Sequence, residues 1–295
     1  MSPTCYQILH ETMYDYRRTV TLSQQLLHMT PRSFIHQQVI SHRLTIAPEP
    51  QDWINRIDYF GNATRSLTLS APHRHLSVQA ESVVALTRRP QLDAIGLTLP
   101  WESQRDRLRS PAEAKSLEPQ MFLFASPHVT CSPALAAYAQ PSFAPGRELL
   151  ESCMALTERI YRDFEFDSDA TTISTPLTDV LRGRRGVCQD FAHLMIGSLR
   201  TLGLACRYVS GYILTTPPAG QPRMVGADAS HAWVSVYCDE VGWVDFDPTN
   251  RCMVKDEHIT LGWGRDFSDV TPMRGLVLGG GGQELQVRVT VTAIE

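Results

Sequence analysis

The sequence GVCQDFA, residues 186–192, places a cysteine where a helix is expected to begin. Apolar residues recur at helical spacing from about Cys188 to Leu202, and Gly203 supplies a natural stop. Free backbone N–H groups and the positive end of the helix dipole lie at such a start, and this setting favours the thiolate, the reactive form of cysteine. Cys188 is therefore a candidate nucleophile, and a buried, inert thiol is the alternative.

A cysteine nucleophile needs a base, and the segment SHAWVSVY, residues 230–237, offers one. The segment alternates as a strand, with apolar residues at 232, 234 and 236 on one face and His231 and Trp233 on the other. A histidine near the start of a strand can project into a cleft, where the neighbouring tryptophan ring shields it from water. A histidine packed in or near the core is the alternative.

The segment GWVDFDPT, residues 242–249, is expected to be a strand that runs into a proline turn, with Asp245 and Asp247 on one face. A carboxylate at the end of a strand beside that of His231 could accept a hydrogen bond from the imidazole and stabilise its charged form. An aspartate that only makes the turn before Pro248 is the alternative. The order cysteine, histidine, aspartate on helix, strand and strand makes the combination more informative than any single residue.

These segments resemble the transglutaminase-like superfamily. The matching sequences are GVCQDFAH at 186–193, ACRYVSGY at 205–212, SHAWV at 230–234 and GWVDFDPTN at 242–250. Residues 5–86 resemble the β-rich N-terminal region of the bacterial branch of that superfamily. The sequence GRDFSDVTP, residues 264–272, is similar to the same branch, although Phe267 and Thr271 stand where it usually has a tyrosine and a second proline.

The resemblance implies a papain-like core in which Cys188 is the nucleophile, His231 the general base and then acid, and Asp247 the orienting acid. Asp247, rather than Asp245, corresponds to the family's acid because it directly precedes the Pro-Thr turn. The implied chemistry is acyl transfer through a thioester acyl-enzyme. The resemblance implies no cofactor and no metal.

Three functions remain open on this resemblance. If water accepts the acyl group, the protein is a cysteine-dependent amide hydrolase, in particular a peptidase, which the likeness to the bacterial branch favours. If an amine accepts it, the protein is a protein-glutamine amine acyltransferase, that is, a transglutaminase. A non-catalytic binding module that uses the same cleft is the alternative of another class, and the intact set of Cys188, His231 and Asp247 argues against it. The expected partner is a peptide or protein amide substrate.

The whole chain is expected to be α+β. Residues 1–90 contain short alternating segments separated by turn signals, which predict an N-terminal antiparallel β-sandwich-like domain. Residues 91–146 are rich in proline and are expected to be a connecting segment packed on the core. Residues 147–295 are expected to form the transglutaminase-like catalytic core with C-terminal strands, in which Gly279–Gly282 reads as a flexible hairpin.

Composition limits the remaining possibilities. The chain has 295 residues, of which 43% are hydrophobic and 20% charged, enough apolar material for a packed core. The formal net charge of −4 does not suggest nucleic-acid or membrane-surface binding, and no stretch reaches the roughly 20 apolar residues of a membrane span. Seven irregularly spaced cysteines without a CxxC argue against a disulfide framework or a zinc finger. The sequence therefore suggests a cytoplasmic protein, and leaves its oligomeric state open.

Overall fold

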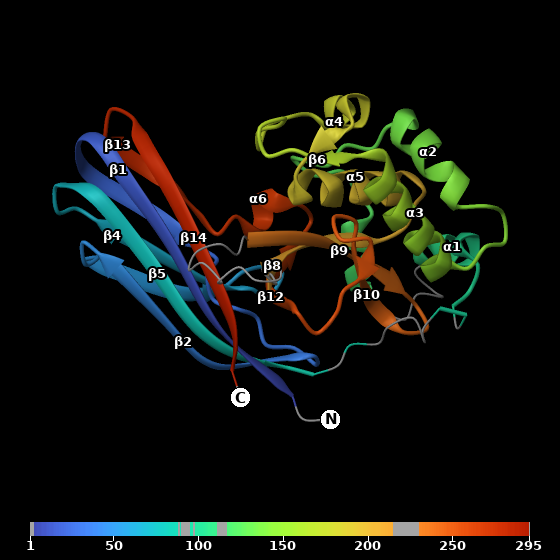
Figure 1. Cartoon of the computed structure of the whole chain (residues 1–295), viewed down its shortest axis with the longest axis horizontal. Helices are drawn as coiled ribbons and strands as arrows, with labels where there is room; N and C mark the ends of the chain where they lie inside the picture. The colour runs from blue at the N-terminus through green and yellow to red at the C-terminus, as the bar shows by residue number, and fades with distance from the viewer. Residues whose placement is uncertain are drawn as a thin grey trace, which may run out of the picture.

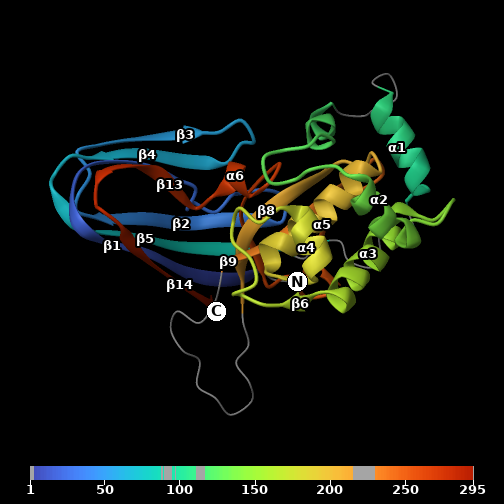
Figure 2. The same ribbon diagram turned by 90° about the horizontal axis from the view of Figure 1, so that it is seen from above.

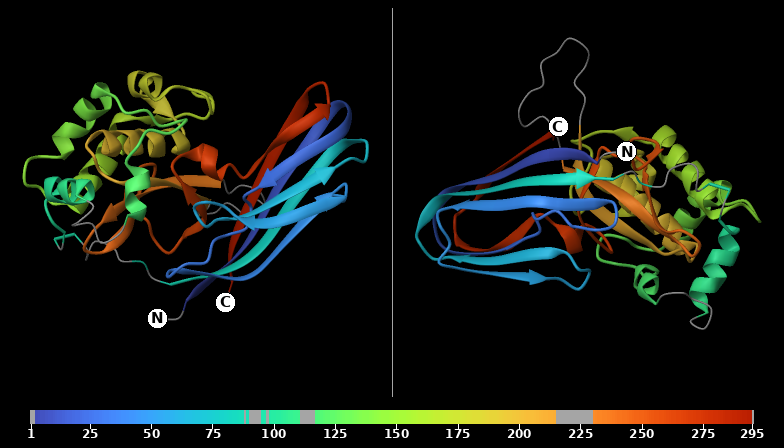
Figure 3. Two further views of the ribbon diagram at one scale, coloured as in Figure 1. Left: turned by 180° about the vertical axis from the view of Figure 1, so that it is seen from behind. Right: turned by 90° about the horizontal axis from the view of Figure 1, so that it is seen from below.

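The computed structural model describes residues 3–87, 89, 95–96, 98–110, 117–214 and 230–294. The chain forms two parts that lie side by side (Figure 1), a β domain built from strands at both ends of the sequence and an α+β core built from the middle. Figures 2 and 3 show the same two parts from other sides, with the helices confined to the core. The expected fold class is confirmed.

The β domain is one antiparallel sheet organised around the 24-residue strand β1 (Thr4–Leu27). The sheet has seven strands in the order β2-β5-β1-β4-β3, and β13 and β14 also pair with β1. The other strands are β2 (Gln37–Ala47), β3 (Asp52–Ile57), β4 (Ala63–Leu69), β5 (His73–Leu86), β13 (Met273–Gly279) and β14 (Gln283–Ile294).

The sheet folds over on itself near the middle of β1, where its register with β5 breaks between Asp15 and Val20. The first half of β1 pairs with β5 and β14, and the second half with β4 and β13. The resulting layers enclose an apolar core to which β4 contributes Leu67 and Leu69 and β5 contributes Leu76 and Val78. A single sheet thus supplies both layers of the sandwich-like domain (Figure 2).

The placement of the C-terminal strands differs from the prediction. They were expected in the catalytic core, but β14 runs along β1, from Ile294 opposite Cys5 to Gln283 opposite Tyr16. The prediction of a hairpin at Gly279–Gly282 is also wrong. Both β13 and β14 pair antiparallel with β1, so they run in the same direction and are not the two arms of a hairpin. These four glycines, all with positive φ, instead carry the chain around the fold-over of the sheet. Alternation in a sequence indicates a strand but not its partner.

The core contains a five-stranded antiparallel sheet in the order β11-β10-β9-β8-β12. Its strands are β8 (Cys206–Ile213), β9 (Ser230–Cys238), β10 (Gly242–Asp247), β11 (Cys252–Met253) and β12 (His258–Gly264). A pair of two-residue strands, β6 (Glu165–Phe166) and β7 (Arg185–Gly186), runs parallel just before the central helix.

Helix α5 (Cys188–Thr201) lies against β8 and β9 and is almost entirely buried (Figure 1). The surrounding helices are α1 (Trp101–Arg109), η2 (Glu118–Phe122), α2 (Pro133–Ala139), η3 (Gln140–Ser142), α3 (Leu149–Asp163), α4 (Leu177–Gly183) and α6 (Phe267–Val270). The helix predicted from about Cys188 to Leu202 is therefore present. The described part of the proline-rich segment adds Val129, Leu135 and Phe143 to the core.

Among the described residues, no helix combines the length and apolar character that a bilayer crossing requires.

A buried amide joins the two parts. Gln37 at the start of β2 is 2% exposed and donates from Nε2 to the carbonyl oxygens of Thr260 and Arg32, each at 2.7 Å. Its Oε1 accepts the Thr260 backbone N–H at 2.8 Å. One side chain thus satisfies three polar backbone groups at the junction.

We expect Gln37→Leu to lower the free energy of unfolding by about 2–4 kcal/mol, because it leaves buried backbone groups without partners. The matched control is Gln38→Leu at the exposed neighbouring position, which should change it by less than about 0.5 kcal/mol. Urea denaturation followed by circular dichroism measures both. Equal losses in the two variants would show that the junction does not depend on this amide.

Candidate active site

Cys188 occupies the first turn of α5, and the chain reaches it through a constrained segment. The carboxylate of Asp190 accepts the Val187 backbone N–H at 2.9 Å and the Thr171 hydroxyl at 2.6 Å. Only glycine fits at position 186, since a Cβ there would lie 2.6 Å from Asp190 Oδ2. These contacts of Asp190 fix the backbone just before α5, and with it the position of the Cys188 thiol.

The structure brings the three predicted residues together. His231, near the start of β9, is 7% exposed, and its Nε2 lies 2.7 Å from Oδ2 of Asp247 at the end of β10. Cys188 lies close enough to the imidazole to raise its pKa. Because Nε2 faces the carboxylate, Nδ1 is the ring nitrogen left for the thiol.

Asp247 is fully buried and surrounded by donors. Its Oδ1 accepts the backbone N–H groups of Thr249 at 2.9 Å and Asn250 at 3.1 Å. Its Oδ2 contacts the Asn250 side-chain amide at 2.6 Å and His258 Nε2 at 3.0 Å, in addition to His231. Asp247 thus forms the turn before Pro248 and also contacts the imidazole. The two roles that the sequence offered as alternatives are therefore both present.

The electrostatics of the site follow from these contacts. Burial opposes a charge on His231, but its hydrogen bond to Asp247 and its interaction with Cys188 raise its pKa to about 10. Burial would raise the pKa of Asp247, yet hydrogen bonds from His231 and His258 hold it below the usual range of an aspartate. The site therefore favours a charged imidazolium beside a charged carboxylate.

His258 is a different kind of histidine. Burial lowers its pKa, and its Nδ1 accepts the Lys255 backbone N–H at 3.4 Å. Nε2 of this neutral ring therefore carries the proton that it donates to Asp247. Sequence analysis missed His258 because the residue acts only through the carboxylate, and it missed Asn250 although that residue closes the motif at 242–250.

Asp245, the other aspartate on this strand, lies outside the group. Its Oδ2 forms an ion pair with Arg89 and accepts the Trp233 indole N–H at 3.2 Å. The Trp233 ring in turn packs against the rings of His231 and His258, with centroids 6.1 and 5.4 Å away. The tryptophan beside His231 thus shields the two histidines, as the strand pattern suggested.

Ligand atoms of His231, Asp247 and His258 all lie within 4.8 Å of one another, which is a spacing that metal ligands can have. The two histidine nitrogens, however, lie only 2.7 and 3.0 Å from the same carboxylate oxygen. The nitrogens that face this oxygen carry protons, on the charged His231 ring and on Nε2 of neutral His258, so neither offers a lone pair to an ion. The arrangement fits a hydrogen-bonded network.

The seven cysteines, all within the described residues, are free thiols. Burial raises the pKa of Cys206 and Cys238 to about 12 and that of Cys252 to about 11. The same cause raises the pKa of Cys153 well above its ordinary value. These four thiols are poor nucleophiles at neutral pH, whereas Cys188 stands next to a base.

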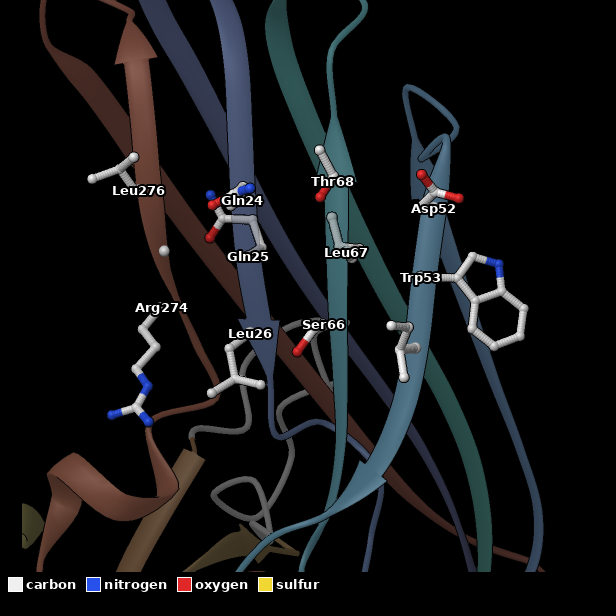
Figure 4. Close-up of a pocket in the computed structure, with 12 residues that line it drawn as sticks. Gln24, Gln25, Leu26, Asp52, Trp53, Ser66, Leu67, Thr68, Arg274 and Leu276 are labelled. Atoms are coloured by element: carbon white, nitrogen blue, oxygen red, sulfur yellow. The ribbon is translucent and has the colours of Figure 1, made fainter.

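A cavity of about 620 Å³ lies elsewhere, on the face of the β domain (Figure 4). It is lined by parts of β1, β3, β4 and β13, including Leu26, Ser66 and Arg274. None of the three predicted residues lines it. The volume of this cavity therefore does not point to the candidate active site, which is defined by its hydrogen bonds.

Comparison with known proteins identifies the family of both parts of the chain. Residues 6–85 match the model of the bacterial transglutaminase-like N-terminal region, and residues 136–248 match that of the transglutaminase-like superfamily. An uncharacterized protein of Mycobacterium tuberculosis is 42% identical over 279 residues, covering 92% of this chain and 87% of that protein. An uncharacterized protein of Mycobacterium leprae is 30% identical over 288 residues, covering 98% of each chain.

One solved structure shares the fold throughout. It is described as a putative cysteine protease from Cytophaga hutchinsonii, with a TM-score of 0.79 at 19% identity, covering 100% of this chain and 92% of that one. A protein-glutamine gamma-glutamyltransferase of Pseudomonas aeruginosa is 32% identical over 116 residues, which is 37% of this chain and 17% of that protein. The chain belongs to the transglutaminase-like superfamily and carries its bacterial N-terminal region.

The raised pKa of His231 makes stability depend on pH in a defined direction. The pKa in the folded protein, about 10, exceeds the unperturbed 6.5, so the stabilisation is complete below pH 6.5 and is lost as pH rises through about 10. We expect wild-type protein to lose more stability than His231→Gln between pH 6.5 and 10, as urea denaturation would measure. Parallel curves would contradict the assigned charge state, because all other titrating side chains are common to both proteins.

Proposed function

We propose that the protein is a cysteine-dependent amide-bond hydrolase, in particular a peptidase. The observation that carries the proposal is the buried His231–Asp247 pair, whose imidazole interacts with Cys188 at the start of α5. A thiol, a base and a carboxylate that orients the base are the parts that nucleophilic acyl transfer requires. A binding module has no need of a charged histidine buried beside a thiol.

The first half of the reaction forms the acyl-enzyme. The Cys188 thiolate attacks the amide carbonyl carbon, and the C–N bond breaks as the His231 imidazolium gives its proton to the leaving amine. The product is a thioester on Sγ and a free amine. Asp247 keeps the ring oriented and stabilises its charged form through the 2.7 Å contact.

The second half restores the thiol. Neutral His231 takes a proton from water as the water oxygen attacks the thioester carbonyl, and the C–S bond breaks to release a carboxylic acid. The proposal assigns oxyanion stabilisation in both steps to backbone N–H groups at the start of α5, including that of Cys188, because the first N–H groups of a helix have no partner within it.

The second candidate function differs only in the acceptor. If an amine replaces water, the product is a new amide and the protein is a protein-glutamine amine acyltransferase. The P. aeruginosa relative, named a protein-glutamine gamma-glutamyltransferase, is the observation that favours it. The same residues serve both reactions, so the products of the reaction decide between them.

Our proposal includes a cytoplasmic location, because a thiolate nucleophile is easily oxidised and the seven cysteines are free thiols.

We expect Cys188→Ala to abolish turnover, with Cys131→Ala, which removes an exposed thiol, as the matched control that retains it. The assay is a peptide-library digest with and without added primary amine, followed by mass spectrometry. New free termini indicate hydrolysis, and amine adducts on glutamine indicate transfer. Full activity in Cys188→Ala would refute the mechanism.

We expect Asp247→Asn to reduce kcat/KM about 10²-fold or more, while residual activity persists because His231 and Cys188 remain. The variant loses the contacts that raise the His231 pKa, so the alkaline limb of the pH–rate profile should move to lower pH. Asp245→Asn is the matched control on the same strand and should leave that limb in place. A limb that moves equally in both variants would argue against Asp247 as the orienting acid.

A further inference from the structure

A second cavity, of about 530 Å³, lies at the junction of the β domain and the core. Cys188, His231 and Asp247 do not line it. Its wall combines Phe34 and its neighbours from the β domain with aromatic and charged side chains of the core, namely Arg89, Glu118, Arg207, Trp243 and Trp263. Aromatic surface beside buried charge is the composition of a site for a small charged molecule.

Arg207 on β8 is the unusual residue of this cavity. It is 7% exposed, and its guanidinium carbon lies 4.1 Å from the ring centroid of Trp243 and 3.8 Å from that of Trp263. Stacking on these rings leaves the edge of the guanidinium as the route for a hydrogen-bonding partner. Its buried Nε has no hydrogen-bond partner among the residues that the structure describes. A buried N–H without a partner is costly, so this donor favours a ligand that accepts a hydrogen bond from it.

The neighbouring charges show what kind of partner fits. Arg89, the other arginine of the wall, already pairs with Asp245 and donates to the Thr260 hydroxyl at 3.0 Å. Arg207 has a more distant carboxylate, that of Glu118, whose oxygen lies 3.8 Å from Nη1. The Glu118 side chain is 49% exposed, and it also accepts the Trp243 indole N–H at 3.4 Å. A carboxylate of the chain therefore lies near Nη1 and leaves the Nε edge without an acceptor.

We propose that this cavity binds a small organic carboxylate with an aromatic or apolar body. Its carboxylate accepts hydrogen bonds from the Nε edge of Arg207, in the side-on geometry that guanidinium and carboxylate groups favour. The Glu118 carboxylate lies nearest a different nitrogen, Nη1. Its apolar body packs against Phe34, Val254 and Trp243. Binding satisfies the buried Nε, and the two tryptophans beside Arg207 report occupancy.

The test uses the full chain and phenylacetate as the probe, with 2-phenylethanol as the neutral molecule of similar size. Titration calorimetry and tryptophan fluorescence at pH 7 and low salt measure binding. We expect saturable binding of phenylacetate, and at least about 10-fold weaker binding of the alcohol, because only the acid completes the Arg207 hydrogen bonds. Equal affinity for the two probes, or no saturable binding of phenylacetate, would overturn the proposal.

Two variants of opposite effect locate the site. Arg207→Gln should weaken phenylacetate binding at least about 10-fold, and Glu118→Gln should strengthen it about 3-fold or more by removing a negative charge beside the guanidinium. Glu284→Gln on β14 removes the same charge from an exposed position outside the cavity and should leave the affinity unchanged. If Arg207→Gln does not fold, Glu118→Gln decides alone. Unchanged affinity in Glu118→Gln, or an equal gain in Glu284→Gln, would overturn the proposal.

Discussion

The fully buried carboxylate of Asp247 is the constraint on which the candidate site depends. A charge removed from water costs several kcal/mol unless hydrogen bonds replace the lost hydration. Here the donors come from the turn after β10, from His231 on β9 and from His258 on β12. Three strands and a turn must therefore converge on one side chain, and this convergence also fixes the orientation of the imidazole that contacts Cys188.

This convergence requires the core sheet to bend, because β12 is not adjacent to β10 in the strand order. Gly211 on β8 lies opposite His231 on β9 and Thr260 on β12. A Cβ at position 211 would lie 2.2 Å from the Ile259 carbonyl oxygen and 2.4 Å from the Trp233 ring. The missing side chain allows the tryptophan and β12 to approach, and so brings His258 within reach of Asp247.

Features with a local signal could be predicted from the sequence. The start of α5 at Cys188, the strand that carries His231 and the turn after Asp247 each follow from neighbouring residues, and family resemblance joined them. Features that depend on distant partners could not be predicted. The pairing of β14 with β1 joins the two ends of the chain, and the contact of His258 with Asp247 crosses two intervening strands. Neither interaction leaves a periodicity in the sequence.

Asp245 and Asp247 show why residue type and spacing leave chemistry open. Both lie on one strand, two residues apart, yet their nearest partners differ. A neutral histidine and a charged one surround Asp247, whereas a permanently charged arginine and an indole N–H hold Asp245. The first carboxylate can stabilise a ring that gains and loses a proton during a reaction, because its partner titrates. The second forms an ion pair with Arg89 and accepts the Trp233 indole N–H, so it fixes the Arg89 side chain and the Trp233 ring in place. Through these two residues it links the cavity at the domain junction to the wall behind the two histidines.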